Sequence, residues 1–185
     1  MNLIDSGLPG VWILDATARV DQPGSFEVLW DGDALRARGL EIRVAQCNLT
    51  ISRQRGTIRG LHWQVKPFDE VKIVQALRGR IFDVAVDLRP ESASFRRWVG
   101  VELTRQNRRA LYVPSGFAHG YQTLTDDAEV MYVVSAPYSP PHQAGARWND
   151  PAFGIEWPLG TPTLIHWRDT TYPDFRWEEP PARNA

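Results

Sequence analysis

Apolar and polar residues alternate along much of the chain, a pattern typical of β-strands that bury one face. An apolar run over residues 71–77 ends at Arg78-Gly79-Arg80, and a second run follows at once over 81–88. We therefore expect these two strands to pair as a hairpin. In the second run, Phe82, Val84, Val86 and Leu88 form one face and Ile81, Asp83, Ala85 and Asp87 form the other. Further strands are expected over 11–20, 26–30, 42–51, 98–103 and 128–135, and the run 111–114 leads into 115–124.

Only one short helix is expected, over residues 33–38, with an aspartate cap and a stop at Gly39. Many short strands with turns at near-regular spacing predict an all-β sandwich or barrel. We expect a single domain over residues 1–185, with a core from about 10 to 170 and a loose tail from about 178 to 185.

One of the expected strands carries polar side chains on a single face. Gln46, Asn48 and Thr50 occupy alternating positions of the run 42–51, so they point to the same side. Such a row usually faces solvent, although a minority of such rows line a polar pocket.

Charge and composition narrow the class of protein. The 185 residues include 21 Lys+Arg and 22 Asp+Glu, so a net charge of -1 gives no argument for binding nucleic acid or an anionic membrane. Cys47 is the single cysteine, which excludes an internal disulfide and fits a reducing compartment. No secretory signal and no run long enough to span a bilayer is visible. A cytoplasmic protein is expected.

The segment 55–64 brings together groups suited to chemistry. It places Arg55, Arg59, His62 and Gln64 in an apolar, strand-forming neighbourhood. Histidine transfers protons near neutral pH, and the arginine guanidinium matches phosphate oxygens. The segment therefore suggests a phosphorylated substrate and acid–base chemistry, or else a tight turn in which His62 is satisfied by a core hydrogen bond.

The four histidines do not predict a metal site. A metal-binding β-helix usually carries two histidines one residue apart on a strand, together with a carboxylate. Neither His62 nor His119 has such a partner in the sequence.

Three further residues have two interpretations each. Lys72 is either a side chain extending along a strand edge or a cation that stabilises an oxyanion. Tyr132 is either a core tyrosine or a proton donor. Asp169 is a surface acid, unless it is paired with a histidine whose ring it would orient.

Several motifs in order resemble the dTDP-4-dehydrorhamnose 3,5-epimerase family. The resemblance runs from about Gly10 to about Asp169. Its motifs are Arg59-Gly60-Leu61-His62-Trp63-Gln64, residues 82–89, Pro114-Ser115-Gly116-Phe117-Ala118-His119-Gly120, Trp148-Asn149-Asp150-Pro151, Ile155-Glu156-Trp157-Pro158 and Arg168-Asp169.

The resemblance implies a cupin-type jelly roll, a double-stranded β-helix, that needs no metal or other cofactor and is usually a homodimer. It implies a nucleotide-linked 4-keto-6-deoxyhexose as substrate and inversion of the carbons that flank the ketone. Such a reaction needs a base, a group that holds the enolate oxygen and an acid on the opposite face.

By motif position, the resemblance implies a role for each candidate residue. His62 matches the base, Asp169 the acid that orients it, Tyr132 the proton donor and Lys72 the group that holds the enolate oxygen. Arg59 and His119 match the pocket around the sugar and diphosphate. The nucleotide side would comprise Gln46, Asn48, Arg168, the base-stacking Tyr138, and Gln143, where the family often has glutamate.

Departures from the family pattern lie on the nucleotide and phosphate side. Pro23 stands where the family has an arginine, Val28 where it has an acid, and Gln143 replaces the glutamate. The proton-transfer residues are intact, so we expect the chemistry to be kept. The nucleotide, the sugar configuration and the number of inverted centres stay open. Two alternatives are a single-centre epimerase on a CDP- or GDP-linked keto sugar and a non-catalytic jelly roll that binds nucleotide sugars.

Overall fold

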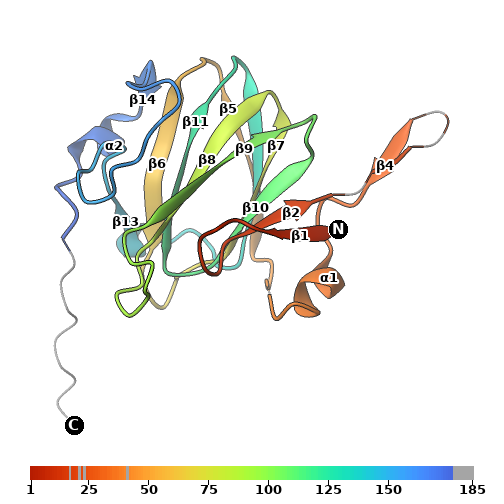
Figure 1. The fold of residues 1–185 in the computed structure, drawn as a ribbon. Helices are drawn as coiled ribbons and strands as arrows, with labels where there is room; N and C mark the ends of the chain where they lie inside the picture. Colours follow the sequence, from red (N-terminus) through yellow and green to blue (C-terminus); the bar gives the residue numbers. More distant parts are fainter. Residues whose placement is uncertain (17, 21, 23, 41, 177–185) are drawn as a thin grey trace, which may run out of the picture.

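The computed structural model describes residues 1–16, 18–20, 22, 24–40 and 42–176, and consists mainly of two antiparallel sheets that face each other (Figure 1). The first sheet has the order β1 (Asn2–Asp5), β2 (Trp12–Asp15), β10 (Arg109–Val113), β7 (Lys72–Arg78), β12 (Ala128–Val134) and β5 (Gln46–Ser52). The second has the order β13 (Gln143–Gly145), β6 (Thr57–Gln64), β11 (Phe117–Thr123), β8 (Arg80–Asp87) and β9 (Trp98–Thr104), and β14 (Leu164–Ile165) pairs with β6 in parallel. This architecture confirms the expected all-β class.

The expected hairpin between residues 71–77 and 81–88 is wrong. Strand β7 pairs with β10 and β12 in the first sheet, whereas β8 pairs with β9 and β11 in the second. Gly79, with a φ of 73°, lies where the chain crosses from one sheet to the other. A Cβ there would lie 2.5 Å from the Thr125 hydroxyl, so the crossing requires glycine.

The crossing follows from the burial of both faces of β8. Ile81 and Ala85 join the core between the sheets, and Val84 and Val86 join a second cluster on the outer face of the second sheet. The chain after β13 covers that outer face with apolar side chains that include Phe153 and Trp157. A strand buried on both faces is stabilised in the middle of such a layered structure rather than in an isolated hairpin.

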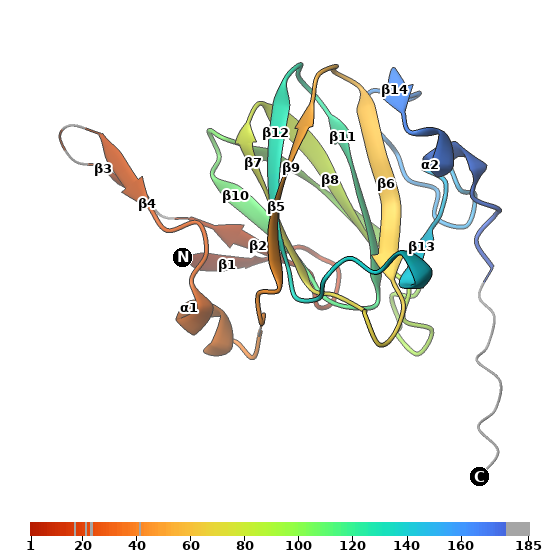
Figure 2. The ribbon, with the colours of Figure 1, turned by 180° about the vertical axis from the view of Figure 1, so that it is seen from behind.

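The N-terminal part of the chain differs from its prediction. The single strand expected over 11–20 is divided into two strands, β2 and β3 (Ala18–Val20). Strand β1 precedes them and was not predicted. Strand β3 pairs with β4 (Ser25–Glu27) in an arm that projects from the body of the molecule (Figure 2). Strand β5 begins at Gln46 rather than at 42.

The first helix is displaced from its predicted position. Helix α1 (Gly32–Arg36) is capped by Asp31, whose carboxylate accepts the backbone N–H groups of Asp33 and Ala34 at 3.0 and 3.1 Å. The cap is therefore Asp31 and not Asp33. The helix buries Leu35 against the outer face of the first sheet. The other short helices are the 3₁₀ turn Pro140–His142 and α2 (Trp167–Thr171).

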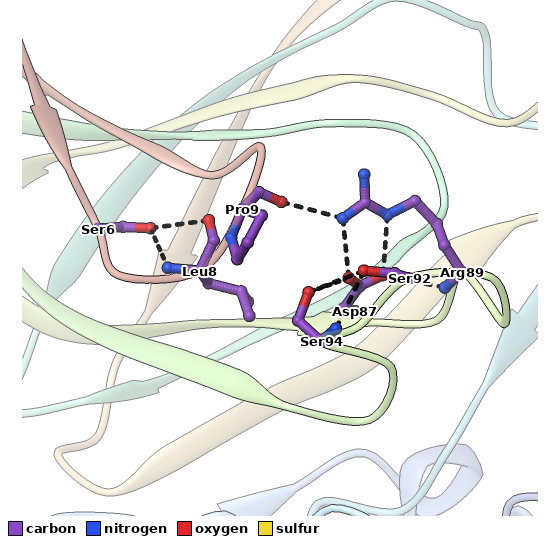
Figure 3. Close-up of polar contacts among 7 residues, drawn as sticks. All are labelled: Ser6, Leu8, Pro9, Asp87, Arg89, Ser92 and Ser94. Carbon is purple, nitrogen blue, oxygen red and sulfur yellow. Dashed lines mark hydrogen bonds and ion pairs between the residues drawn. The ribbon is translucent and has the colours of Figure 1, made fainter.

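A buried carboxylate ties the N-terminal loop to the end of β8 (Figure 3). Asp87 is fully buried and accepts hydrogen bonds from the guanidinium of Arg89 at 2.8 and 2.9 Å and from the Ser94 hydroxyl at 2.6 Å. Arg89 also donates to the carbonyl of Pro9 at 2.9 Å. Burial alone would raise the pKa of Asp87, but the hydrogen bonds, led by that from Arg89, lower it to about 2.

Two sequence predictions concern residues outside the described part of the chain. Pro23, which replaces the arginine of the family pattern, is one, and the tail 178–185 is the other. Within the described residues, no helix has the length and apolar character needed to cross a membrane.

Candidate active site

A cavity with two adjoining lobes, each of about 310 Å³, is lined from both sheets and from α2. All eleven predicted site residues line it. The first lobe holds Arg59, His119, Arg168 and Asp169, and the second holds Gln46, Asn48 and Tyr138. Both lobes share His62, Lys72, Tyr132 and Gln143. The structure therefore brings the predicted residues together in one place.

An irregularity in β6 turns Arg59 and His62 to the same cavity. His62 lies opposite His119, and Arg59 lies opposite Tyr121, so two residues of β6 face one residue of β11 between these pairs. This is the count of a β-bulge, which changes the alternation of the strand. Gly60 lies in the bulge with a φ of 120°, and a Cβ there would lie 2.6 Å from the Cα of Gly120. The Arg-Gly-Leu-His motif is thus a structural requirement for presenting both side chains.

His62 is held by a carboxylate from the distant helix α2. The Nε2 of His62 lies 2.7 Å from Oδ1 of Asp169, and the other oxygen of Asp169 accepts the N–H of Gly60 at 3.2 Å. Burial raises the pKa of Asp169, but the His62 hydrogen bond and charge and the Gly60 hydrogen bond outweigh it, so the pKa lies below its usual value. An ionised carboxylate fixes the orientation of the ring.

A second histidine–aspartate pair lies deeper in the molecule. The Nε2 of His119 lies 2.8 Å from Oδ1 of Asp83, which is fully buried on the neighbouring strand β8. Asp83 is one of the polar positions of the alternating run in β8; its Oδ1 is paired with His119, whereas its buried Oδ2 has no hydrogen-bond partner among the described residues. Arg59 is held differently, because its Nε donates to the Ser52 hydroxyl at 3.1 Å.

Lys72 and Tyr132 approach from the sheet opposite His62. They lie on the adjacent strands β7 and β12 of the first sheet, whereas His62 lies on β6 of the second. The Lys72 ammonium is 3.1 Å from a carboxylate oxygen of Glu70, and both side chains are mostly buried. The sequence had indicated the lysine but not its anionic partner.

Hydrogen bonds organise the second lobe around Gln143. Its side-chain oxygen accepts from the hydroxyl of Tyr138 and, at 3.0 Å, from the guanidinium of Arg168. The backbone N–H of Tyr138 donates to the side chain of Gln46 at 3.3 Å. The Tyr138 ring is more than half exposed, so its face is available to a flat ligand.

The cavity also contains Tyr121, His166 and Glu70, which sequence reasoning did not assign to it, and Thr50, which strand alternation had placed on one face with Gln46 and Asn48. Tyr121 follows His119 by two positions, so strand alternation could have placed both on one face. Its buried hydroxyl makes no hydrogen bond of normal geometry among the described residues, although the Ser52 hydroxyl, which accepts from Arg59, is close enough to interact with it. Burial raises the pKa of Tyr121 to about 12, which keeps it protonated.

A β-sandwich with an aspartate-held histidine, a lysine and a tyrosine around one cavity has the groups that acid–base chemistry needs. The family model described as dTDP-4-dehydrorhamnose 3,5-epimerase matches residues 5–176. The chain belongs to the dTDP-4-dehydrorhamnose 3,5-epimerase family, which confirms the expected resemblance and the cupin-type jelly roll.

Individual relatives agree with this assignment. The dTDP-4-dehydrorhamnose 3,5-epimerase of Sinorhizobium fredii is 42% identical over 84% of this chain and 80% of that protein. The dTDP-4-dehydrorhamnose 3-epimerase of Streptomyces niveus is 38% identical over 89% of this chain and 79% of that protein. The crystal structure of the 3,5-epimerase from Bacillus anthracis, with TDP and PPi bound, matches with a TM-score of 0.90 at 36% identity over 94% of this chain and 99% of that chain.

Proposed function

We propose that this chain inverts C3 and C5 beside the 4-ketone of a dTDP-linked 4-keto-6-deoxyhexose. The observation that carries the proposal is the placement of His62 and Tyr132 on facing sheets around a shared cavity. A proton removed on one side of a carbon and returned on the other inverts that carbon. The fold alone would not assign this chemistry, because one fold hosts many functions.

In the proposed reaction, His62 is the base. Asp169 accepts the Nε2–H of His62, so the basic lone pair is on Nδ1. Nδ1 takes the proton from the carbon next to the ketone, and the C–H electron pair moves into the carbon–carbon bond while the carbonyl oxygen becomes an enolate. Aspartate positioning of this kind fixes one tautomer and stabilises the imidazolium that forms.

Lys72 and Tyr132 complete the step. The Lys72 ammonium lies in the cavity and would hold the enolate oxygen, which carries most of the charge that develops. Tyr132, on the opposite sheet, would return a proton to the other face of the carbon, and the enolate would revert to the ketone. No net oxidation occurs, so the step balances without an external electron acceptor.

Binding of the nucleotide is proposed for the second lobe and the rim of the first. Arg59 and Arg168 offer guanidinium groups to the diphosphate, and His119 lines the sugar side. Tyr138 would stack on the nucleotide base, and Gln46 and Asn48 would contact the nucleoside. The Bacillus anthracis relative, described with TDP and PPi bound, supports a nucleotide ligand in this fold.

We also infer that the protein forms a homodimer. Its location in the cytoplasm stays a prediction. Strand β5 is an edge strand that exposes Leu49 and Ile51, and the arm formed by β3 and β4 exposes Phe26 and Val28. Exposed apolar groups on an edge and on a projecting arm support association with a second copy. Analytical ultracentrifugation would give the mass of one chain if this inference is wrong.

The test is deuterium incorporation from deuterated water into a dTDP-4-keto-6-deoxyhexose. The proposal predicts solvent deuterium at both C3 and C5 of the product. One alternative, a single-centre enzyme, would label one carbon alone; the relatives named 3,5-epimerase, at up to 42% identity, do not favour it. Absence of label from dTDP-, CDP- and GDP-linked keto sugars would favour the non-catalytic alternative.

A further inference from the structure

Lys72 reaches the cavity as one half of an ion pair. Its ammonium nitrogen lies 3.1 Å from Oε1 of Glu70, and the exposed fractions of the two side chains are 13% and 11%. No other partner of this ammonium occurs among the described residues, so the remaining N–H groups are available to a ligand. Both residues line the second lobe of the cavity.

Glu70 is itself held by Gln64, the last residue of β6. The Gln64 side-chain nitrogen donates to Oε2 of Glu70 at 3.3 Å and to the carbonyls of Phe68 and Pro137 at 3.0 and 3.2 Å. The Gln64 side-chain oxygen accepts the N–H of Ser139 at 2.6 Å. A chain of contacts therefore runs from Lys72 through Glu70 and Gln64 to the segment that carries Tyr138.

We propose that Glu70 is a positioning residue for Lys72 and that it fixes the ammonium where the enolate oxygen forms. The inference rests on the proposed function, because it requires Lys72 to stabilise the enolate. Nothing in the Arg-Gly-Leu-His motif or in the family description assigns a role to Glu70.

The physical reason lies in the lysine side chain. Lysine carries a point charge on four rotatable bonds, and holding it in one place costs conformational entropy at the moment of reaction unless the folded protein already restrains it. Stabilisation of a transition state is strongest when the charged group needs no rearrangement. The Glu70 carboxylate supplies that restraint and leaves other N–H groups of the ammonium free. Gln64 restrains the carboxylate in turn.

The role makes a distinctive prediction about catalysis. Replacing Glu70 by alanine should lower kcat about 10–100-fold, because a displaced catalytic group typically costs up to about 100-fold. The KM should change far less, because Lys72 acts mainly on the charge that develops in the reaction. Glu70→Gln keeps an oxygen that can accept from Lys72, so it should restore part of the lost kcat.

The test is a double-mutant cycle on kcat with Glu70→Ala and Lys72→Met, using a dTDP-4-keto-6-deoxyhexose as substrate. If Glu70 acts through Lys72, then Glu70→Ala should cause little further loss once Lys72 is replaced. Glu102→Gln, which removes a carboxylate from an exposed ion pair with Arg80, is the matched control and should keep the wild-type rate. Thermal melting and dTDP binding of each variant report on folding, and Glu70→Gln replaces Glu70→Ala in the cycle if the alanine variant does not fold.

Two results would overturn the inference. Equal losses from the Glu70 substitution in both backgrounds would mean that Glu70 acts independently of Lys72. Full activity of Lys72→Met would instead remove the role of Lys72 from the proposed function, and with it the role of Glu70. The single lysine variant therefore separates failure of the proposed function from failure of this inference.

Discussion

The Nε2 of His62 lies 2.7 Å from Oδ1 of Asp169, although the two residues are 107 positions apart in the chain. Asp169 is almost fully buried, and its second oxygen accepts the N–H of Gly60, two residues before the histidine. One carboxylate thus holds both the bulge that presents His62 and the ring itself. The proposed base depends on this contact between the second sheet and α2.

Replacing Asp169 by asparagine should reduce kcat about 10²–10⁴-fold, the usual range for a general base. An amide can donate to Nε2, which would place the ring proton on Nδ1 and remove the basic lone pair from the cavity. Steady-state kinetics would measure the loss. Asp33→Asn, at an exposed site on α1, is the matched control. A wild-type rate in Asp169→Asn would contradict the pairing.

Replacing Tyr132 by phenylalanine should separate exchange from inversion. His62 could still remove a proton and return a deuteron to the same face, but the opposite donor would be missing. We expect deuterium in recovered substrate of unchanged configuration, measured by NMR, with little epimerised product. Tyr112 packs in the apolar cluster that contains Leu35 of α1, so Tyr112→Phe is the control and should leave inversion intact. Normal inversion by Tyr132→Phe would mean that the donor is another group.

The sequence predicted the strands well and their pairing poorly. The alternation over residues 81–88 predicts a strand with two different faces, but it does not predict which other strands pair with it. The short Arg78-Gly79-Arg80 connection is typical of a hairpin, yet here it links two sheets. Pairing depends on the apolar segments that cover each face, and these come from distant parts of the chain.

The candidate site was predicted as a set of residues and not as a set of contacts. Motif order identified His62, Lys72, Tyr132 and Asp169, and all four line the cavity. Asp83, the partner of His119, lay in the motif over residues 82–89 but had no predicted role, and Glu70, the partner of Lys72, had no signal of its own. Carboxylates in a strand or a loop are common, and only their burial beside a histidine or a lysine distinguishes these two.

Replacing Tyr121 by phenylalanine should leave the free energy of unfolding of the free protein unchanged or raise it by up to about 1 kcal/mol. Within the part of the chain that the structure describes, the hydroxyl is buried and makes no hydrogen bond of normal geometry, and an unpaired buried polar group is unfavourable to folding. Urea denaturation without ligand would measure the change. A loss of more than about 1 kcal/mol would show that the hydroxyl has a partner, such as Ser52.

Asp87 should make stability depend on pH in the acidic range. Its pKa of about 2 in the folded protein lies below the ordinary value of 3.8, so folding favours the ionised form. The resulting stabilisation, on the order of 2 kcal/mol, is present above the ordinary pKa and is lost as the pH falls toward 2. Asp87→Asn should therefore destabilise the protein at pH 7 by about that amount, and the difference from wild type should shrink between pH 5 and pH 2.

Urea denaturation of both proteins across this range would test the prediction. Glu102→Gln serves as the control, because its ion pair with Arg80 is exposed. A difference between Asp87→Asn and wild type that stays constant with pH would mean that the network in Figure 3 does not act through the charge of Asp87.

The most direct measurement is solvent exchange by His62→Asn in deuterated water, followed by NMR at C3 and C5 of a dTDP-4-keto-6-deoxyhexose. Asparagine keeps a polar side chain of similar size but cannot act as a base, so deuterium incorporation at both carbons should fall about 10²–10⁴-fold. Exchange at the wild-type rate at both carbons would contradict the assignment of His62 as the base.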